Sequence, residues 1–308
     1  MSLLIAFSGQ GAQHHNMFNI LTEDIFGKTW LKAASVLINI DLLDKTAVEK
    51  ACLDVIQVQR LNVILSVGIF QSLKRQLKIE PAFLCGYSLG EISAFSVSAN
   101  LDLKTICELV TKRAEVMQNA MSVYPAAGGL AVVKGKINIG QIQKLLEEHT
   151  CYIAIINADD HFIIGGLLTN VDALLLEAKQ LGVVKAERLA VKLPSHTPLL
   201  AEATDRFLQY LQCISTHFMQ YPILNALTNE LILNSEDMLP ILAKELSQTL
   251  HWDKVMRIAK EYGISSFLEI GPGASLKNMM LVNFPQIRAY NSESFATLNG
   301  LLAFVNKF

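Results

Sequence analysis

The chain contains few charged residues and no organised cysteines. Charged residues make up 18% of its 308 positions, the formal net charge is -2, and the five cysteines are Cys52, Cys85, Cys107, Cys151 and Cys213. None belongs to a CxxC pair or to a Cys/His cluster with zinc spacing, so we expect free thiols in a reducing compartment and no metal site. Without a basic excess, the composition also argues against nucleic-acid binding.

Long apolar segments are missing as well. The apolar stretch Leu3–Phe7 is short and follows no basic region, so it does not fit a signal peptide. No run of about 18 apolar residues could span a membrane. We therefore expect a soluble, cytoplasmic protein. Hydrophobic residues still make up 51% of the chain, which is enough for a large buried core.

Strands and helices alternate in the first part of the chain. The apolar patterns predict strands at Leu3–Phe7 and Pro81–Gly86, and helices over Val63–Leu77, from about Gly90, and over 103–120. Such alternation favours an α/β class with a large parallel-sheet, hydrolase-like core.

The middle of the chain has a different order of elements, which predicts an inserted ferredoxin-like α+β subdomain at 125–192. The catalytic core would then consist of 1–124 and 193–308. The expected elements of the insert are strands at 128–133, 151–157, 161–165 and 183–191, with helices at 138–148 and 170–181.

The core pattern resumes after the insert. We expect helices at 198–212 and 236–248, then a strand at Phe267–Ile270 that ends in the turn Gly271-Pro272-Gly273. That turn either lines the floor of a site or only terminates the strand.

Ser88 lies in G86-Y-S-L-G90, between a predicted strand and a predicted helix. In this context G-x-S-x-G forms a sharp turn that exposes a nucleophilic serine, with the glycines allowing close backbone approach. The N-terminus of the following helix favours developing negative charge. The alternative is an ordinary surface loop.

A nucleophilic serine needs a base, and His196 is the candidate. It lies in the stretch LPSHTP, from Leu193 to Pro198, where two prolines stiffen the return from the insert to the core. A stiff loop can hold an imidazole in place for general-base catalysis. The prolines could equally serve only to shape the crossover.

Two backbone amides are candidates for an oxyanion hole. The amide of Leu89 directly follows the serine, and the loop G9-Q-G-A-Q13 brings Gln10 to the same edge of a parallel sheet. The loop could instead bind phosphate or be a plain turn, although it matches neither G-x-G-x-x-G nor a Walker sequence.

Arg113 lies beside the apolar stripe of its predicted helix. A guanidinium there needs a partner, and a bound carboxylate ligand would supply one. An ion pair with Glu108 or Glu115, or an arginine extended to the surface, would also satisfy it.

Five motifs in order resemble the malonyl-CoA:acyl-carrier-protein transacylase family, and the resemblance covers nearly the whole chain. They are FSGQGAQ at 7–13, GYSLGE at 86–91, KRAEVMQ at 112–118, PSHT at 194–197 and LEIGPGASL at 268–276. The resemblance implies malonyl transfer from malonyl-CoA to an acyl carrier protein in fatty acid biosynthesis, without a metal or redox cofactor.

The resemblance also implies a role for each candidate residue. Ser88 would be the nucleophile, His196 the base, and Gln10 and Leu89 the oxyanion donors, while Arg113 would bind the malonyl carboxylate. Two further correspondences complete the set. A main-chain carbonyl at His251 would orient the catalytic histidine, and Asn62 would match a family glutamine near the substrate.

Three positions depart from the family pattern. Ser8 replaces a usual proline, Tyr87 a usual histidine, and Asn62 the longer side chain of a glutamine. Tyr87 and the stretch IINADDHFIIG at 155–165 are also similar to the malonyl-transfer subunit of malonate decarboxylase, which has the same chemistry and a different carrier.

Two other classes of protein share parts of this pattern. A serine esterase of the α/β-hydrolase type shares G-x-S-x-G, but would usually carry an HGGG loop and an acid between serine and histidine. A non-catalytic carrier-binding module would not need the serine, histidine and arginine together.

Overall fold

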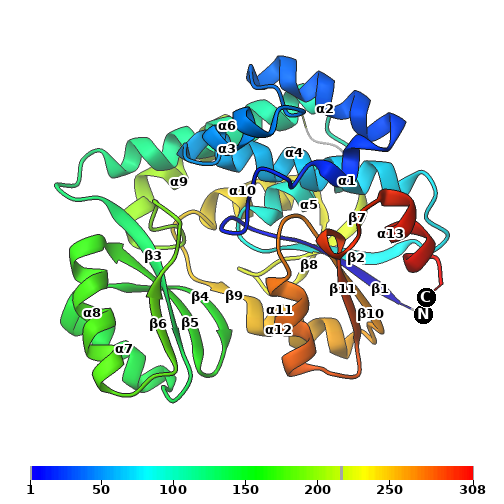
Figure 1. The fold of residues 1–308 in the computed structure, drawn as a ribbon. Coiled ribbons are helices and arrows are strands. Elements are labelled where there is room, and N and C mark those ends of the chain that lie inside the picture. Colours follow the sequence, from blue (N-terminus) through cyan, green and yellow to red (C-terminus); the bar gives the residue numbers. More distant parts are fainter. Residues whose placement is uncertain (1, 216–217, 308) are drawn as a thin grey trace.

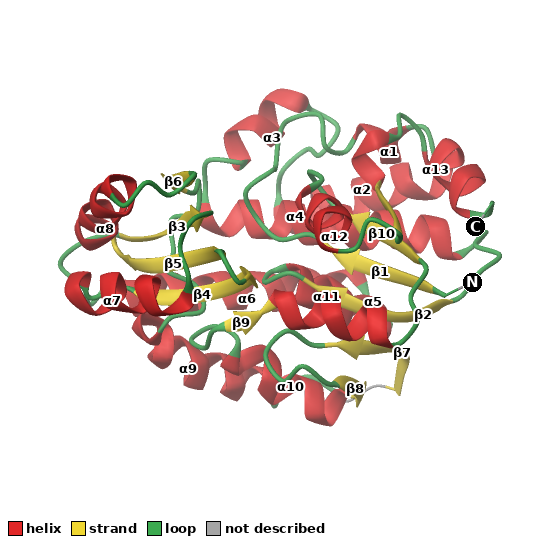
Figure 2. Cartoon of the chain, turned by 90° about the horizontal axis from the view of Figure 1, so that it is seen from below, coloured by secondary structure: helices red, strands yellow, loops and turns green. Residues whose placement is uncertain are grey.

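Two β-sheets lie side by side in the computed structural model, which describes residues 2–215 and 218–307 (Figures 1 and 2). The mixed α/β class predicted from the sequence is confirmed. The first sheet has six strands, in the order β11 (Arg288–Asn291), β10 (Ser266–Ile270), β1 (Leu3–Phe7), β2 (Pro81–Gly86), β7 (Phe218–Leu224) and β8 (Leu231–Asn234). All neighbours in it are parallel except β7 and β8.

The carboxyl ends of three central strands of this sheet meet at one edge. The last residue of β1, Phe7, pairs with Ile270 of β10 on one side and with Gly86 of β2 on the other. The turns that follow these strands therefore begin next to one another, which is where parallel sheets hold ligands.

Helices cover both faces of the six-stranded sheet because successive residues of a buried strand point to opposite sides. Leu3, Ile5 and Phe7 pack into one hydrophobic cluster, and Leu4 and Ala6 into another. The first cluster takes residues from α1 (Asn19–Thr22), α2 (Ile25–Ile38), α3 (Lys45–Ala51), α4 (Val55–Lys74), α5 (Gly90–Ser98), α6 (Leu103–Met121), η1 (Pro198–Leu200), α9 (Ala201–Leu211), α10 (Ser235–Lys244) and α13 (Leu298–Val305). The second takes residues from α11 (Trp252–Glu261) and α12 (Ser275–Asn283).

The second sheet packs α7 (Ile139–His149) and α8 (Leu168–Gln180) on its outer face, at the lower left of Figure 1. Its inner face shares a cluster with Trp252, Val255 and Met256 of α11, so this helix joins the two sheets. The strand order is β6 (Lys185–Arg188), β3 (Gly128–Lys134), β5 (His161–Leu167), β4 (Tyr152–Ala158) and β9 (Leu250–His251).

The strand β9 belongs to the part of the chain that follows the insert, and it pairs in parallel with β4. The small sheet therefore draws on more than 125–192, and the domain boundaries stay a prediction. No helix in the described ranges combines the length and apolar character that a membrane crossing needs.

Most predicted elements in the first part of the chain and in the insert match the structure to within a few residues, but the helix expected at Val63–Leu77 is Val55–Lys74 and so begins earlier. Two predictions were too long. The expected strand at 183–191 is only Lys185–Arg188, and the expected helix at 236–248 ends at Lys244. Because that helix ends early, the main-chain carbonyl of Glu245 lacks a partner within the helix and can accept a hydrogen bond in the site.

Candidate active site

Ser88 occupies a sharp turn between β2 and α5. Its φ of 56° lies in the left-handed region that non-glycine residues seldom adopt. The glycines on either side permit this turn: a Cβ on Gly90 would lie 2.0 Å from the carbonyl oxygen of Phe7, and one on Gly86 would lie 2.1 Å from the amide nitrogen of Glu91. The local sequence thus forces the serine out at the carboxyl edge of the sheet.

His196 meets this serine from the loop that leads back from the small sheet. Its Nε2 lies 2.7 Å from the Ser88 hydroxyl oxygen, and its Nδ1 contacts the main-chain carbonyl of Glu245. Because a carbonyl can only accept, Nδ1 carries the proton and Nε2 is the acceptor for the serine hydroxyl. The histidine also has a positive φ of 64°, and its amide donates to the Leu246 carbonyl at 2.8 Å. The histidine is therefore held at three points.

The pKa of His196 is lowered to about 3. Burial is the largest cause, the positive charge of Arg113 adds to it, and the hydrogen bond to Glu245 opposes it. The ring is consequently neutral at physiological pH, with Nε2 free to take a proton.

The expectation that His251 supplies the orienting carbonyl is wrong, because that contact belongs to Glu245. His251 lies in β9, where it pairs with Ile156, and its own amide donates to the Ala226 carbonyl. The physical reason is the early end of α10. The carbonyls of the last helical turn lack intrahelical partners, and His196 uses one of them.

The amides of Gln10 and Leu89 lie on two turns that touch. A Cβ on Gly9 would come within 2.7 Å of the Tyr87 carbonyl oxygen, so the loop 9–13 lies against the serine turn. Among the described residues, neither amide donates a hydrogen bond within the chain. Unused donors beside a serine are what an oxyanion hole requires.

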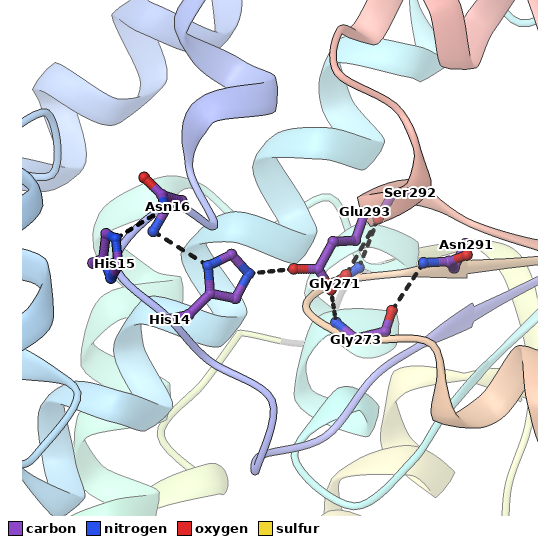
Figure 3. Close-up of polar contacts among 8 residues, drawn as sticks. All are labelled: His14, His15, Asn16, Gly271, Gly273, Asn291, Ser292 and Glu293. Carbon is purple, nitrogen blue, oxygen red and sulfur yellow. Dashed lines mark hydrogen bonds and ion pairs between the residues drawn. The ribbon is translucent and has the colours of Figure 1, made fainter.

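The glycine-proline-glycine turn after β10 supports the loop 9–13. A Cβ on Gly273 would lie 2.7 Å from the Cβ of Ala12. Figure 3 shows His14, just after the loop, reaching the carboxylate of Glu293, whose other oxygen accepts from the Gly273 amide. Both glycine-rich turns are thereby tied together, and the turn does more than terminate its strand.

Arg113 is buried, at 4% exposure, and its guanidinium donates to the Gln59 side-chain oxygen at 2.6 Å. The alternative of an ion pair with Glu108 or Glu115 is wrong, since both acids pair with lysines of α6 instead. No described carboxylate lies within ion-pair distance of this cation. Burial lowers the pKa of Arg113 to about 10, so the group stays charged at neutral pH.

Gln59 was missed in the sequence, although it stands just under one helical turn before Asn62 on α4. Asn62 is buried and donates to the Val58 carbonyl of its own helix at 2.7 Å. Its role in substrate binding stays a prediction, and the contact with Arg113 belongs to Gln59. The sequence did hold a signal for Gln59, because a glutamine within an otherwise apolar helical stripe indicates a buried polar contact.

Tyr87 links the serine turn to the small sheet. Its hydroxyl donates to the Asn157 side-chain oxygen at 3.2 Å, and its ring packs edge-on against Trp252 at 5.3 Å between ring centroids. Burial raises the pKa of the Tyr87 phenol, which therefore remains a neutral donor. Tyr87, which stands where the family usually has histidine, thus connects the serine turn to the small sheet.

Residues 5–297 match the model of a family described as an acyl transferase domain. This chain belongs to that family. The resemblance to malonyl-CoA:acyl-carrier-protein transacylases inferred from the motifs is confirmed by its relatives. The malonyl CoA-acyl carrier protein transacylase of Buchnera aphidicola subsp. Schizaphis graminum is 27% identical, over 98% of either chain. That of Synechocystis sp. is 25% identical, over 96% of this chain and 98% of its own.

Solved structures agree with this acyl transferase fold. The malonyl CoA-acyl carrier protein transacylase of Coxiella burnetii has a TM-score of 0.89 at 26% identity, covering 100% of this chain and 97% of its own. A malonyl-transacylase in complex with a type II PKS acyl-carrier protein has a TM-score of 0.89 at 25% identity, covering 99% of this chain and 100% of its own.

Proposed function

We propose that this acyl transferase moves a malonyl group from coenzyme A to the phosphopantetheine thiol of an acyl carrier protein in fatty acid biosynthesis, through a malonyl ester of Ser88. The observation that carries the proposal is the environment of the Arg113 guanidinium. It is a buried cation whose charge acts on His196, and its hydrogen-bond partner is the neutral side chain of Gln59. A carboxylate-bearing acyl group would complete that site.

In the first half-reaction Ser88 attacks the thioester carbonyl while its hydroxyl proton passes to Nε2 of His196. The amides of Gln10 and Leu89 would hold the oxyanion, which typically contributes ~10²–10³ in rate for each donor. The carbon–sulfur bond then breaks, and His196 returns the proton to the sulfur of coenzyme A. The Glu245 carbonyl keeps Nδ1–H in place and so fixes the imidazole for both transfers.

In the second half-reaction the thiol of the carrier gives its proton to His196 and attacks the malonyl ester. The ester bond to Ser88 breaks, and the serine oxygen recovers a proton from the imidazole. Every step uses side chains and amides of the chain itself, so the proposed chemistry calls for no metal or redox cofactor.

We also infer the finer architecture. The succession β3, α7, β4, β5, α8, β6, with the strand order β6-β3-β5-β4, supports a ferredoxin-like subdomain at about 125–192. The parallel sheet with a serine turn after β2 supports a hydrolase-like core formed by 1–124 and 193–308. The five cysteines are free thiols, which supports our assignment of the enzyme to a reducing compartment, the cytoplasm.

The malonyl-transfer subunit of malonate decarboxylase is a second candidate, and one contact favours it. Tyr87 and the stretch that contains Asn157 carried that resemblance in the sequence, and the two residues are hydrogen-bonded to each other. The chemistry would be the same, and only the carrier would differ.

Mixing the protein with radiolabelled malonyl-CoA and a carrier tests the function. We expect label to accumulate on the fatty-acid acyl carrier protein and only slowly in free malonate. Transfer to the malonate decarboxylase carrier alone would favour the second candidate. Rapid release to water without a labelled carrier would indicate an esterase and contradict both proposals.

A further inference from the structure

A pair of buried carboxylates lies beneath the candidate site and takes no part in the mechanism described above. Glu91 lies in the first turn of α5, just after the serine turn, and Glu245 follows α10. The side-chain nitrogen of Asn225 donates to Glu91 at 2.8 Å and to Glu245 at 2.6 Å. The three side chains are 0–4% exposed, so one amide group bridges two carboxyl groups in a dry interior.

Two carboxylates so close together in a nonpolar interior cannot both be charged at low cost. Neither Glu91 nor Glu245 forms an ion pair with any residue in the described ranges. Burial raises the pKa of Glu245 to about 8, and burial together with the charge of Glu245 raises that of Glu91 well above its ordinary value. Ionisation of either carboxyl group therefore opposes ionisation of the other.

Charged and titratable groups face this pair from the surrounding elements. Arg113 on α6 is the cation whose charge lowers the pKa of Glu245, and Glu245 in turn raises the pKa of Arg113. Burial, and after it the charge of Glu91, raise the pKa of the Cys85 thiol on β2, so this thiol stays protonated. His196 contacts the main chain of Glu245 and remains neutral.

We propose that Glu91 and Glu245 share buried protons and that the charge of Glu245 sets how strongly Arg113 binds the carboxylate of an incoming acyl group. The proposal rests on the malonyl transfer proposed above. With Glu245 protonated, Arg113 has only the neutral Gln59 as its hydrogen-bond partner, and its charge is available to the substrate.

Ionisation of Glu245 changes that balance. The new negative charge offsets the guanidinium and repels a second carboxylate, so malonyl binding weakens above about pH 8. By linkage, a malonyl carboxylate that binds at Arg113 must raise the pKa of Glu245 and draw a proton from solvent. Glu245 is thus a positioning residue in two ways: its carbonyl orients His196, and its side chain tunes Arg113.

Calorimetry on the Ser88→Ala variant isolates this coupling, because the variant binds malonyl-CoA without reacting. Titrations at about pH 8 in buffers of different ionisation enthalpy give the number of protons taken up. We expect roughly half a proton per malonyl-CoA bound, since about half of Glu245 is ionised at that pH. Acetyl-CoA, which has the same nucleotide but no acyl carboxylate, should take up none.

The variant Glu245→Gln in the same background keeps the size and hydrogen bonding of the side chain. It should abolish proton uptake and remove the roughly tenfold loss of malonyl-CoA affinity expected between about pH 7 and pH 9. Glu269→Gln is the matched control. It removes another buried carboxyl with a pKa raised to about 7, on β10, and should preserve the uptake.

Malonyl-CoA binding with no proton uptake, or with equal uptake in Glu245→Gln, would overturn the coupling while leaving malonyl transfer intact. If malonyl-CoA neither bound to Ser88→Ala nor labelled the unmodified enzyme, the proposed function itself would fall, and the coupling with it.

Discussion

Replacing Ser88 by alanine is expected to lower the rate of malonyl transfer by on the order of 10⁴–10⁶-fold, because the covalent route disappears with its nucleophile. Replacing His196 by alanine should cost nearly as much, since the serine hydroxyl then has no acceptor for its proton. The two residues act as one unit, joined by the 2.7 Å contact. A double variant should therefore be no slower than either single variant.

The measurement is the transfer of radiolabelled malonyl to a carrier under single-turnover conditions. Ser96→Ala is a suitable control, because this serine is buried on α5, the helix that follows the Ser88 turn, and donates only to the Ile92 carbonyl. It should transfer at close to the normal rate. Multiplicative losses in the double variant would mean that Ser88 and His196 act independently, contrary to the proposed mechanism.

Replacing Arg113 by alanine is expected to lower kcat/KM for malonyl-CoA by roughly 10²–10³-fold, the cost of losing charge-assisted hydrogen bonds to a buried carboxylate. Acetyl-CoA has no such carboxylate, so its transfer should change by less than about tenfold, or improve once an unpaired cation is gone. The quantity that matters is the ratio of the two kcat/KM values. This ratio of malonyl to acetyl kcat/KM should fall toward 1 in Arg113→Ala.

Arg113→Lys separates charge from shape. Lysine keeps the charge but lacks the planar fork that binds a carboxylate through two parallel hydrogen bonds, so selectivity should fall only part of the way. Lys112→Ala provides the neighbouring control, because Lys112 pairs with Glu115 at the surface of α6. Equal losses for malonyl and acetyl in Arg113→Ala would remove Arg113 from the carboxylate role.

Local features of the sequence were enough to predict the serine turn. A strand that ends in glycine, a serine and a second glycine at the start of a helix leaves the backbone few choices, and Ser88 lies where this pattern requires. The α/β class and the parallel pairing around β1 followed from strands that alternate with helices. The contact with His196 also agrees with expectation, since a loop stiffened by Pro194 and Pro198 carries it.

Features that depend on distant segments were harder to predict. The partner of Nδ1 was placed at His251, just before Trp252, by its correspondence with the family, yet the true partner is set by where α10 ends. Helix ends are the least certain part of a sequence pattern, and a shift of a few residues exchanges one carbonyl for another. Gln59 and Asn62 differ by less than one helical turn, and only packing against α6 decides which one meets Arg113.

No local pattern in the sequence indicated the hydrogen-bonded bridge from Glu91 through Asn225 to Glu245. Its three members come from α5, the turn after β7 and the end of α10, and their burial results from the packing of all three segments. The same holds for Tyr87 and Asn157, which meet across the two sheets. Buried polar contacts of this kind become visible only in three dimensions.

Mass spectrometry of the enzyme after brief mixing with malonyl-CoA, in the absence of a carrier, tests the central claim most directly. We expect one malonyl group per chain, located on the peptide that contains Ser88, absent from Ser88→Ala and lost when a carrier thiol is added. A malonyl group on another residue, or steady transfer to the carrier by Ser88→Ala, would contradict the account.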